Sequence, residues 1–409
     1  MGSDPTPEMW GGPLARGITN AALGASFAFL YASQGKLLKK SFHAAVGVVA
    51  LAALMATSAQ AQTRTASGTH GDLQWTAQSM LVGTIATNGG AGETIYTGSM
   101  PGFSGVVGLS MGGFVCTGSL MSDRQSILTA AHCVEGIANN GVTAFFRNPG
   151  SGPDVQLYYG GPGYTTVGSS LVTIHPLYTG DVIDQNDIAV VRLAAPAPAF
   201  ADAYGIFTGS SLTGVQTNVT GFGSTSSVGG SVGVNTVNPN RLGWFRQGEN
   251  VYDFRMGDAL FGSVWSSILG EPASQIEYSY ITDFDNGLAT NDASCRVTQA
   301  SNFGGIPGTT FCNTGLGARE VGVAGGDSGG PSFVGGLVAS VNSYGLSFGT
   351  AFGDAVSGLQ SSYGEFSGYV PTYIHADFIN AALVPEPGTY AMMLAGLAAM
   401  GLMVRRRQS

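Results

Sequence analysis

Ser328 lies in a stretch suited to nucleophilic chemistry, Gly325-Gly326-Asp327-Ser328-Gly329-Gly330-Pro331. Its small neighbours leave the hydroxyl on a tight turn that another molecule can approach. A serine hydroxyl is a weak nucleophile near neutral pH, so acyl transfer requires a base and a group that holds this base in place. His132 and Asp187, each beside a short apolar stretch, are the candidates for these two roles.

The order of the candidates along the chain separates two hydrolase patterns. Residues 326–330 also satisfy the Gly-x-Ser-x-Gly pattern of α/β-hydrolases, in which the serine comes first and the histidine last. Here His132 comes first, and Gly-Gly-Pro is poorly suited to open the helix that such a serine requires. His375 could serve as a late base, but it lies on a helix predicted over residues 373–383, and we expect it to be a surface residue.

The composition predicts an all-β protein. Only 10% of the 409 residues are charged and 64 are glycine, which favours short strands and turns over helices. The net charge of -9 argues against a nucleic-acid partner, because no basic stripe exists to neutralise phosphates. The expected strands cover residues 105–109, 113–120, 126–132, 156–159, 167–175, 188–193, 214–223 and 336–341.

The amino-terminal region has the pattern of a secretory signal. Three lysines precede an apolar run over residues 44–55, and an Ala-x-Ala pattern ends at Ala61. We therefore predict a signal peptide over residues 36–61; the run is short of the about 20 residues that a membrane span needs. Residues 1–35 are interpreted as an early start or an extended basic region, and residues 62–94 as a linker or pro-segment.

The four cysteines are expected to form two disulfides, because the chain is exported and their number is even. They are Cys116, Cys133, Cys295 and Cys312, and the sequence alone allows three pairings. One pairing, Cys116 with Cys133, would tie the end of a strand to its neighbour. No Cys-x-x-Cys pair is present, so a zinc site is disfavoured, and we expect neither a metal nor a cofactor.

An acidic stretch, Asp283-Phe284-Asp285-Asn286-Gly287, lies in a region predicted as an inserted loop, residues 224–294. Its carboxylates could bind calcium, but their spacing does not fit the helix-loop-helix pattern. Asp and Asn before Gly are turn formers, so we expect a solvated β-turn there.

Three motifs together resemble the signature blocks of the chymotrypsin-like serine peptidases, in the same order. They are Thr129-Ala130-Ala131-His132-Cys133, Asn186-Asp187-Ile188-Ala189-Val190-Val191-Arg192-Leu193 and Gly326-Asp327-Ser328-Gly329-Gly330-Pro331. The resemblance covers residues 95–383 and implies two six-stranded antiparallel β-barrels, followed by the carboxy-terminal helix, with the site in the cleft between the barrels. It also implies a structural place for His175, within Ile174-His175-Pro176-Leu177-Tyr178.

The resemblance also implies a role for each site residue. Ser328 would be the nucleophile, His132 the base and then the acid, and Asp187 the carboxylate that orients His132. The backbone N–H groups of Gly326 and Ser328 would form the oxyanion hole. Ser343-Tyr344-Gly345 stands where the family has the strand that pairs with the substrate backbone, with Tyr in place of the usual Trp.

The specificity pocket is expected to carry no charge. Gly322 stands six residues before the nucleophile, where trypsin-like members have Asp, and Val323 lies beside it. The residue of the substrate before the cleaved bond, P1, is therefore predicted to be apolar. Ala324 replaces a cysteine that many members have, which leaves Cys295 to pair with Cys312. Ile95 is the candidate new amino terminus that would pair with Asp327 on activation.

The carboxy terminus, residues 384–409, resembles the PEP-CTERM sorting signal of Gram-negative bacteria. Pro385-Glu386-Pro387 is followed by an apolar run over residues 389–404 and three arginines. The resemblance implies export to the cell envelope, surface or medium, handling by an exosortase, and transient membrane insertion of a tail that is then removed. The leading hypothesis is an exported serine endopeptidase acting on a protein or peptide. The alternative is a surface matrix or adhesion protein that uses the same scaffold for binding.

Overall fold

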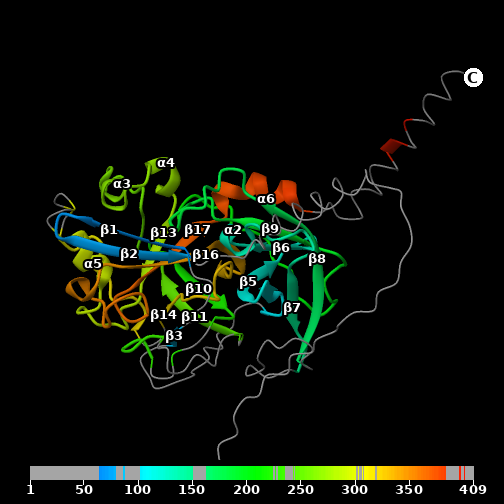
Figure 1. Cartoon of the computed structure of the whole chain (residues 1–409), viewed down its shortest axis with the longest axis horizontal. Helices are drawn as coiled ribbons and strands as arrows, with labels where there is room; N and C mark the ends of the chain where they lie inside the picture. Colours follow the sequence, from blue (N-terminus) through cyan, green and yellow to red (C-terminus); the bar gives the residue numbers. More distant parts are fainter. Residues whose placement is uncertain are drawn as a thin grey trace, which may run out of the picture. The chain divides into compact units, whose positions relative to one another are not determined.

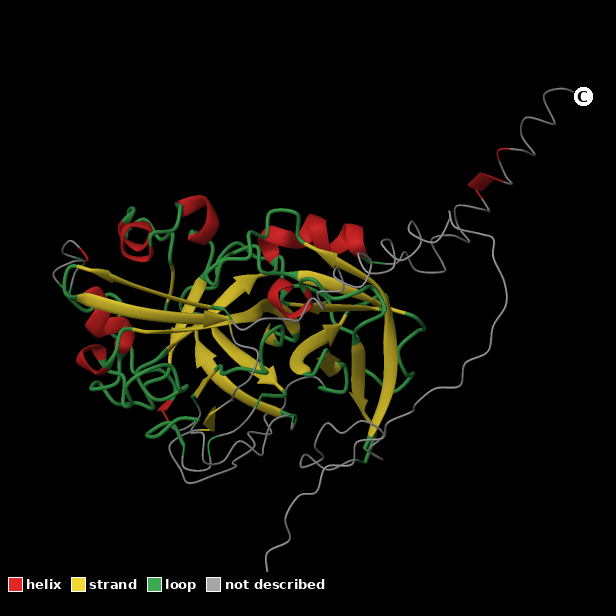
Figure 2. Ribbon diagram, in the orientation of Figure 1, coloured by secondary structure: helices red, strands yellow, loops and turns green. Residues whose placement is uncertain are grey.

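Strands make up most of the folded chain, and the helices are short (Figure 2). The computed structural model describes residues 64–79, 86–87, 102–150, 163–223, 226, 229–234, 243, 245–300, 303, 306, 308–317, 320–383, 396–397 and 400. The predicted signal peptide, the strand predicted at 156–159 and Ile95 lie outside these residues. The all-β prediction is confirmed.

The first unit is a closed six-stranded antiparallel barrel, as predicted. Its strands are β4 (Val106–Met111), β5 (Phe114–Leu120), β6 (Ser126–Thr129), β7 (Thr143–Arg147), β8 (Tyr164–Ile174) and β9 (Ala189–Leu193). The order is β4-β5-β6-β9-β8-β7, and pairing of β7 with β4 closes the barrel. All six residues of β4 and all four of β6 are buried, because the barrel interior and flanking elements cover both faces.

The second unit is a curled sheet in the order β11-β10-β15-β16-β17-β13-β12. Its strands are β10 (Gln216–Gly221), β11 (Arg246–Val251), β12 (Phe254–Arg255), β13 (Tyr280–Asp283), β15 (Pro331–Val334), β16 (Leu337–Ser347) and β17 (Phe366–Pro371). In the described part of the chain this sheet stays open, where a second closed barrel was expected. A separate two-stranded sheet pairs β14 (Val321–Gly322) with β3 (Ala86–Thr87).

An amino-terminal hairpin adds two strands to the second unit. β1 (Thr65–His70) pairs with β2 (Leu73–Ser79), and β2 pairs with the second half of β16 (Figure 1). Leu73, Trp75 and Ala77 alternate along β2, point into the same core and are buried. Part of the segment expected to be a linker or pro-segment is therefore a regular hairpin, specified by a pattern only three apolar residues long.

Short helices lie at the ends of strands. They are α2 (Ala131–Val134), α3 (Val264–Leu269), α4 (Ala273–Ile276), α5 (Ala293–Thr298) and α6 (Ala376–Ala382), with single 3₁₀ turns at η3 (Thr350–Phe352) and η4 (Tyr373–His375). The predicted carboxy-terminal helix is confirmed as η4 followed by α6. Phe378 and Ile379 of α6 pack against the core of the first unit, which fixes the helix against the barrel.

Candidate active site

His132 lies on the first turn of α2, directly after the barrel strand β6. The strand ends at Thr129, three residues earlier than expected, and Ala130 is extended with ψ of 147° before the helix begins. The backbone N–H of His132 therefore lies in a helix first turn, where it has no intrahelical acceptor. The side chain is only 2% exposed.

Asp187 satisfies both the backbone and the ring of His132. Asp187 Oδ1 accepts from the His132 N–H at 2.8 Å, and Oδ2 lies 2.6 Å from His132 Nδ1. Ser343 Oγ also donates to Oδ2, at 2.5 Å. Burial by itself raises the pKa of Asp187, but the charge of His132 and the hydrogen bonds from His132 and Ser343 outweigh it and hold the pKa below its usual range. The carboxylate is therefore kept ionised against the imidazole.

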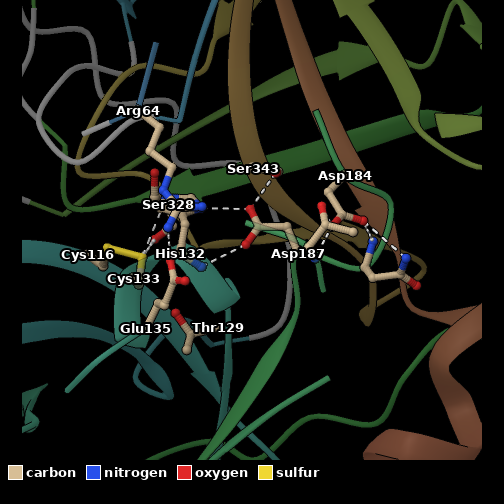
Figure 3. Close-up of polar contacts among 12 residues, drawn as sticks. Arg64, Cys116, Thr129, His132, Cys133, Glu135, Asp184, Asp187, Ser328 and Ser343 are labelled. Carbon is tan, nitrogen blue, oxygen red and sulfur yellow. Dashed lines mark hydrogen bonds and ion pairs between the residues drawn. A yellow bond between two sulfur atoms is a disulfide. The ribbon is translucent and has the colours of Figure 1, made fainter. Parts of the chain in front are cut away.

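Ser328 lies on a turn between β14 and β15 that touches both units. Its carbonyl accepts from Thr117 N of β5 at 2.8 Å and lies 3.6 Å from Cys133 Sγ, which is itself 3.8 Å from His132 Nε2. Figure 3 shows Ser328 beside His132, with Asp187 on the other side of the imidazole. The Ser328 hydroxyl is buried and makes no hydrogen bond in the described part of the chain. The hydroxyl oxygen is therefore a buried polar atom without a hydrogen-bond partner, next to His132.

The backbone around Ser328 leaves two donors unused. Within the described residues, the N–H groups of Gly326 and Ser328 donate no hydrogen bond. Gly326 has φ of 96°, and its carbonyl is held by Thr117 Oγ1 at 2.8 Å. Gly329 has φ of 80°, and a Cβ there would collide with Thr129 Oγ1. The glycines thus give this turn its shape, and the two free N–H groups could bind an anionic oxygen.

Asp327, the residue before the serine, points away from it into the interior. Its carboxylate accepts from Gly223 N at 2.8 Å and from Ala324 N at 3.3 Å. Burial raises the pKa of Asp327 well above its usual value, against the lowering effect of these two donors. The proposed partner of Asp327, the amine of Ile95, lies outside the described residues.

Both expected disulfides are present. Cys116 of β5 is bonded to Cys133 of α2, which fixes the helix that carries His132 to the barrel wall. Cys295 is bonded to Cys312, in the region before the serine turn.

The residues expected at the specificity pocket lie against an aromatic pair. Gly322 is in β14, and a Cβ built on it would lie 3.1 Å from Phe284 Cδ1. The Phe284 ring packs edge-on against Tyr363, with 4.7 Å between centroids. Val323 N donates to Ser367 Oγ at 2.8 Å. Phe284 was missed in the sequence because its proximity to Gly322 depends on long-range pairing.

Ser343, Tyr344 and Gly345 lie in β16 as an extended segment. Ser343 uses its hydroxyl on Asp187, a contact between residues 156 positions apart that no local motif signals. Tyr344 pairs with Ser79 and Gly345 with Gln78, both in β2. The strand edge expected to receive a substrate is therefore covered by the chain's own amino-terminal hairpin.

His375 is buried, which corrects the expectation of a surface residue. It is 4% exposed, its Nε2 lies 2.7 Å from the Gln185 carbonyl oxygen, and its ring packs edge-on against His175 at 4.6 Å. Burial lowers the pKa of His375 to about 4 and also lowers that of His175. The helical pattern gave the correct element but the wrong face, because η4 turns His375 toward the loop before Asp187.

The acidic turn is also buried, where a solvated turn was expected. Asp283 and Asp285 are 2% and 0% exposed. Asn286 and Gly287 do form a turn with φ of 57° and 78°, so the turn chemistry was correct. The predicted solvent exposure was wrong because α5 and the residues before β14 pack over the turn. The local sequence pattern of the turn carries no information about these covering segments.

The described part of the chain combines a mostly β architecture with a buried His132-Asp187 pair next to Ser328, whose hydroxyl makes no hydrogen bond there. Two family models match this chain: the trypsin family over residues 91–241, and the PEP-CTERM protein-sorting motif over residues 383–407. Part of the chain therefore matches the trypsin family, whose fold the described strands have, and its carboxy-terminal part matches the PEP-CTERM motif. No match was found among curated proteins.

The two matches assign a general class and destination. The trypsin domain is that of a chymotrypsin-like serine peptidase at the level of the family, which implies a protein substrate. The matched range includes His132 and Asp187 and ends before Ser328. The sorting motif indicates export to a bacterial surface or medium and recognition by an exosortase. No helix in the described part of the chain is long and apolar enough to cross a membrane.

Proposed function

We propose that the protein is an exported serine endopeptidase in which Ser328 attacks the peptide carbonyl. The observation that carries the proposal is the hydrogen-bonded His132-Asp187 pair with the unpartnered Ser328 hydroxyl beside it. His132 Nδ1 is held by Asp187, which leaves Nε2 as the atom that takes the proton from Ser328. His132 then returns that proton to the leaving amine, and water repeats the sequence on the acyl-enzyme.

The developing negative charge would be met by backbone donors. The N–H groups of Gly326 and Ser328 are free in the described part of the chain and lie on the turn that carries the hydroxyl. Donors held in place before the reaction stabilise an oxyanion strongly, at about 3 kcal/mol for one donor. Their lack of an internal acceptor supports this role.

We propose an apolar P1 preference for the same site. Gly322 and Val323 bring no charge, and the Phe284 ring lies against Gly322. Because none of these three side chains carries a charge, a substrate lysine or arginine that packed against them would be desolvated and unpaired. A peptide library with varied P1 residues should show cleavage after apolar residues, and strict cleavage after Arg or Lys would contradict the preference.

One observation favours the second candidate, a binding scaffold. Ser328 is only 1% exposed, and the edge of β16 at Tyr344–Ser347 is already paired with β2. A scaffold without catalysis needs neither an accessible hydroxyl nor a free edge.

Labelling with a fluorophosphonate separates the two candidates. We expect one covalent adduct on Ser328, found by mass spectrometry of the folded full chain. Ser328→Ala should abolish the adduct, whereas Ser357→Ala, which changes an exposed serine, should leave it unchanged. The scaffold would be supported if the folded wild type stays unlabelled and the folded variant Gln78→Pro, which weakens the pairing of β2 with β16, also stays unlabelled.

A further inference from the structure

Five carboxyl groups gather in the second unit, around the end of β13. Asp283 ends β13, Asp285 lies in the turn that follows, and Asp292 caps the amino terminus of α5 by accepting from Cys295 N at 2.7 Å. Glu320 precedes β14, and Asp253 precedes β12. The first four are nearly fully buried, and Asp253 is partly exposed. The active-site residues of the proposed peptidase are not among them.

Three of these groups are close enough to share one ion. One carboxylate oxygen from each of Asp283, Asp285 and Asp292 lies within 4.8 Å of the others. Two oxygens bound to the same Ca²⁺ at 2.3–2.6 Å are at most about 5.2 Å apart. The spacing therefore fits a single calcium ion between the three side chains.

The turn leaves carboxylate oxygens without donors. Asp285 Oδ1 accepts from Gly287 N at 2.7 Å, but Oδ2 is buried and accepts no hydrogen bond in the described part of the chain. Glu320 Oε2 accepts from the N–H groups of Asp285 and Asn286, while its Oε1 is likewise buried without a donor. Buried oxygens that lack donors are costly unless a cation binds them.

Protein cations do not supply the missing charge. Among the described residues, none of the salt bridges involves a member of the cluster, and Arg296 acts weakly on Asp292 alone. The cluster lacks positive charge, in agreement with the missing donors.

We propose that Asp283, Asp285 and Asp292 bind one calcium ion, with Asp253 and Glu320 as flanking carboxylates. Calcium is favoured because all the groups are oxygen ligands and because it accepts six to eight of them in flexible geometry. Water would complete the shell. A pocket of about 450 Å³ is lined in part by Asn313 and by Asp253, one of the two flanking carboxylates. For an exported protein, millimolar calcium in the medium is sufficient for such a site.

Calcium titration of the folded full chain tests this site. In isothermal titration calorimetry we expect one ion per chain, with a dissociation constant between about 10⁻⁵ and 10⁻³ M. Replacing EGTA by 10 mM calcium should raise the melting temperature by about 5 °C, and equal magnesium should have a smaller effect. Asp285→Asn should weaken calcium binding at least tenfold. Asp377→Asn, an exposed aspartate on α6, is the matched control and should bind as the wild type.

Two outcomes would overturn the calcium site. Absence of binding heat and of a melting shift in the wild type would show that Asp285 and Glu320 share a proton instead of a cation. Unchanged binding in Asp285→Asn would place the ion elsewhere. If Asp285→Asn does not fold, Asp292→Asn, nearer the surface at the start of α5, locates the site by the same titration.

A different observation carries a second inference, which rests on the proposed function and concerns its regulation. β2 runs antiparallel to β16, with Ser79 opposite Tyr344, Gln78 opposite Gly345 and Ala77 opposite Leu346. An extended peptide substrate would add to this same edge, because it pairs its backbone with a free strand. The edge has room for one partner, and β2 already occupies it.

The hairpin is also tied to the opposite wall of the site. Arg64, just before β1, forms an ion pair with Glu135 at 2.5 Å, three residues after His132. Arg64 also packs against Gly180, where a Cβ would collide with its guanidinium. Figure 3 shows Arg64 next to Ser328 and His132. The segment therefore contacts the first unit through Arg64 and the second through β2.

From this placement we infer that the β1-β2 hairpin is an internal competitor that holds the peptidase closed until it is displaced. Trp75 anchors β2, because its ring is buried and its Nε1 donates to the Ile268 carbonyl at 2.9 Å. Displacement breaks the pairing of residues 76–79 with β16 and leaves the edge free for a substrate. No covalent step is required for this opening.

Gln78→Pro tests the inference in the full chain. Gln78 is the second-last residue of β2 and lies between Thr65 of β1 and Gly345 of β16, so a proline there, which has no N–H and a fixed φ, should weaken the pairing of β2 with β16. We expect fluorophosphonate labelling of Ser328 and hydrolysis of a peptide with apolar P1 to rise at least tenfold. A synthetic peptide with the sequence of residues 73–79 should restore inhibition, and the same residues in scrambled order should not.

The results distinguish this inference from the proposed function. Equal labelling and hydrolysis by wild type and folded Gln78→Pro would reject the competitor while leaving the peptidase intact. No labelling of either folded protein would reject the peptidase itself. Inhibition by the scrambled peptide would show that the effect does not depend on the register of β2.

Discussion

Two groups of buried carboxylates in this chain differ in what surrounds them. Asp187 is 2% exposed and receives three hydrogen bonds, two from His132 and one from Ser343. Asp285 is 0% exposed, yet one of its oxygens has no donor in the described part of the chain. The pKa of Asp187 is held below its usual range, whereas burial raises that of Asp285. Burial alone therefore does not decide the charge of these groups; the donors do.

The difference follows from where the partners originate. His132 and Ser343 come from α2 and β16, which approach Asp187 from the two units. The neighbours of Asp285 come from segments that bring further acids, including Asp283 and Glu320. Asp187 receives its hydrogen bonds from within the protein, whereas Asp285 has an oxygen without a donor, which the proposed calcium ion would bind.

The largest expected effect is on catalysis at the complete site. Asp187→Asn would present an amide to His132, favour the wrong tautomer and remove the charge that stabilises imidazolium, so kcat should fall about 10⁴-fold. Asp184→Asn is the matched control, because Asp184 is buried three residues away and bonds to Thr179 and Asn186 instead of His132. Peptide hydrolysis by both folded variants gives the comparison. Equal losses would show that position 187 acts only through folding.

Asp187→Asn and Asp285→Asn should have opposite effects on stability without calcium. Asp187→Asn leaves donors on His132 and Ser343 facing an amide, which should lower the free energy of unfolding by about 3 kcal/mol. Asp285→Asn removes one of several adjacent buried charges, so in EGTA it should raise that free energy by about 1 kcal/mol. Urea unfolding monitored by circular dichroism measures both. Destabilisation by Asp285→Asn in EGTA would mean that the cluster is satisfied without a cation.

The barrel strands and the candidate residues were predictable because their signals are local. Each of His132, Asp187 and Ser328 has a motif of a few residues, and short apolar runs between glycines marked β4 and β5. The structure places His132 and Asp187 in direct contact, as the motifs implied. Their catalytic roles remain predictions that kinetics must test.

What could not be predicted depends on contacts between distant segments. The bond from Ser343 to Asp187, the pairing of β2 with β16 and the position of Phe284 against Gly322 each join residues far apart in sequence. The second sheet was expected to close, and its described strands do not, because closure depends on partners for β11 and β12 that no local pattern specifies. The predicted solvent exposure of Asp285 and His375 was wrong for the same reason, because their local sequence patterns are those of surface residues.

His375 is a buried base, and its burial predicts how the stability of the protein changes at low pH. Burial lowers the pKa of His375 to about 4, so the unfolded chain, with a histidine near its ordinary value, binds the proton more tightly. Stability from this group is therefore present above about pH 6.5 and is lost as the pH falls toward 4. We expect a loss of about 2 kcal/mol at pH 5. His375→Gln should reduce this loss in urea titrations at pH 5 and 7, and an unchanged difference would assign it to other groups.

The smallest predicted effect concerns the single donor from β16. Ser343→Ala removes one of the three hydrogen bonds to Asp187 and leaves both bonds to His132, so kcat/KM should fall about fivefold, equivalent to about 1 kcal/mol. Ser343→Thr keeps the hydroxyl and should recover most of the rate. A loss as large as that of Asp187→Asn would show that Ser343 positions the carboxylate, and that the bonds to His132 cannot do so alone.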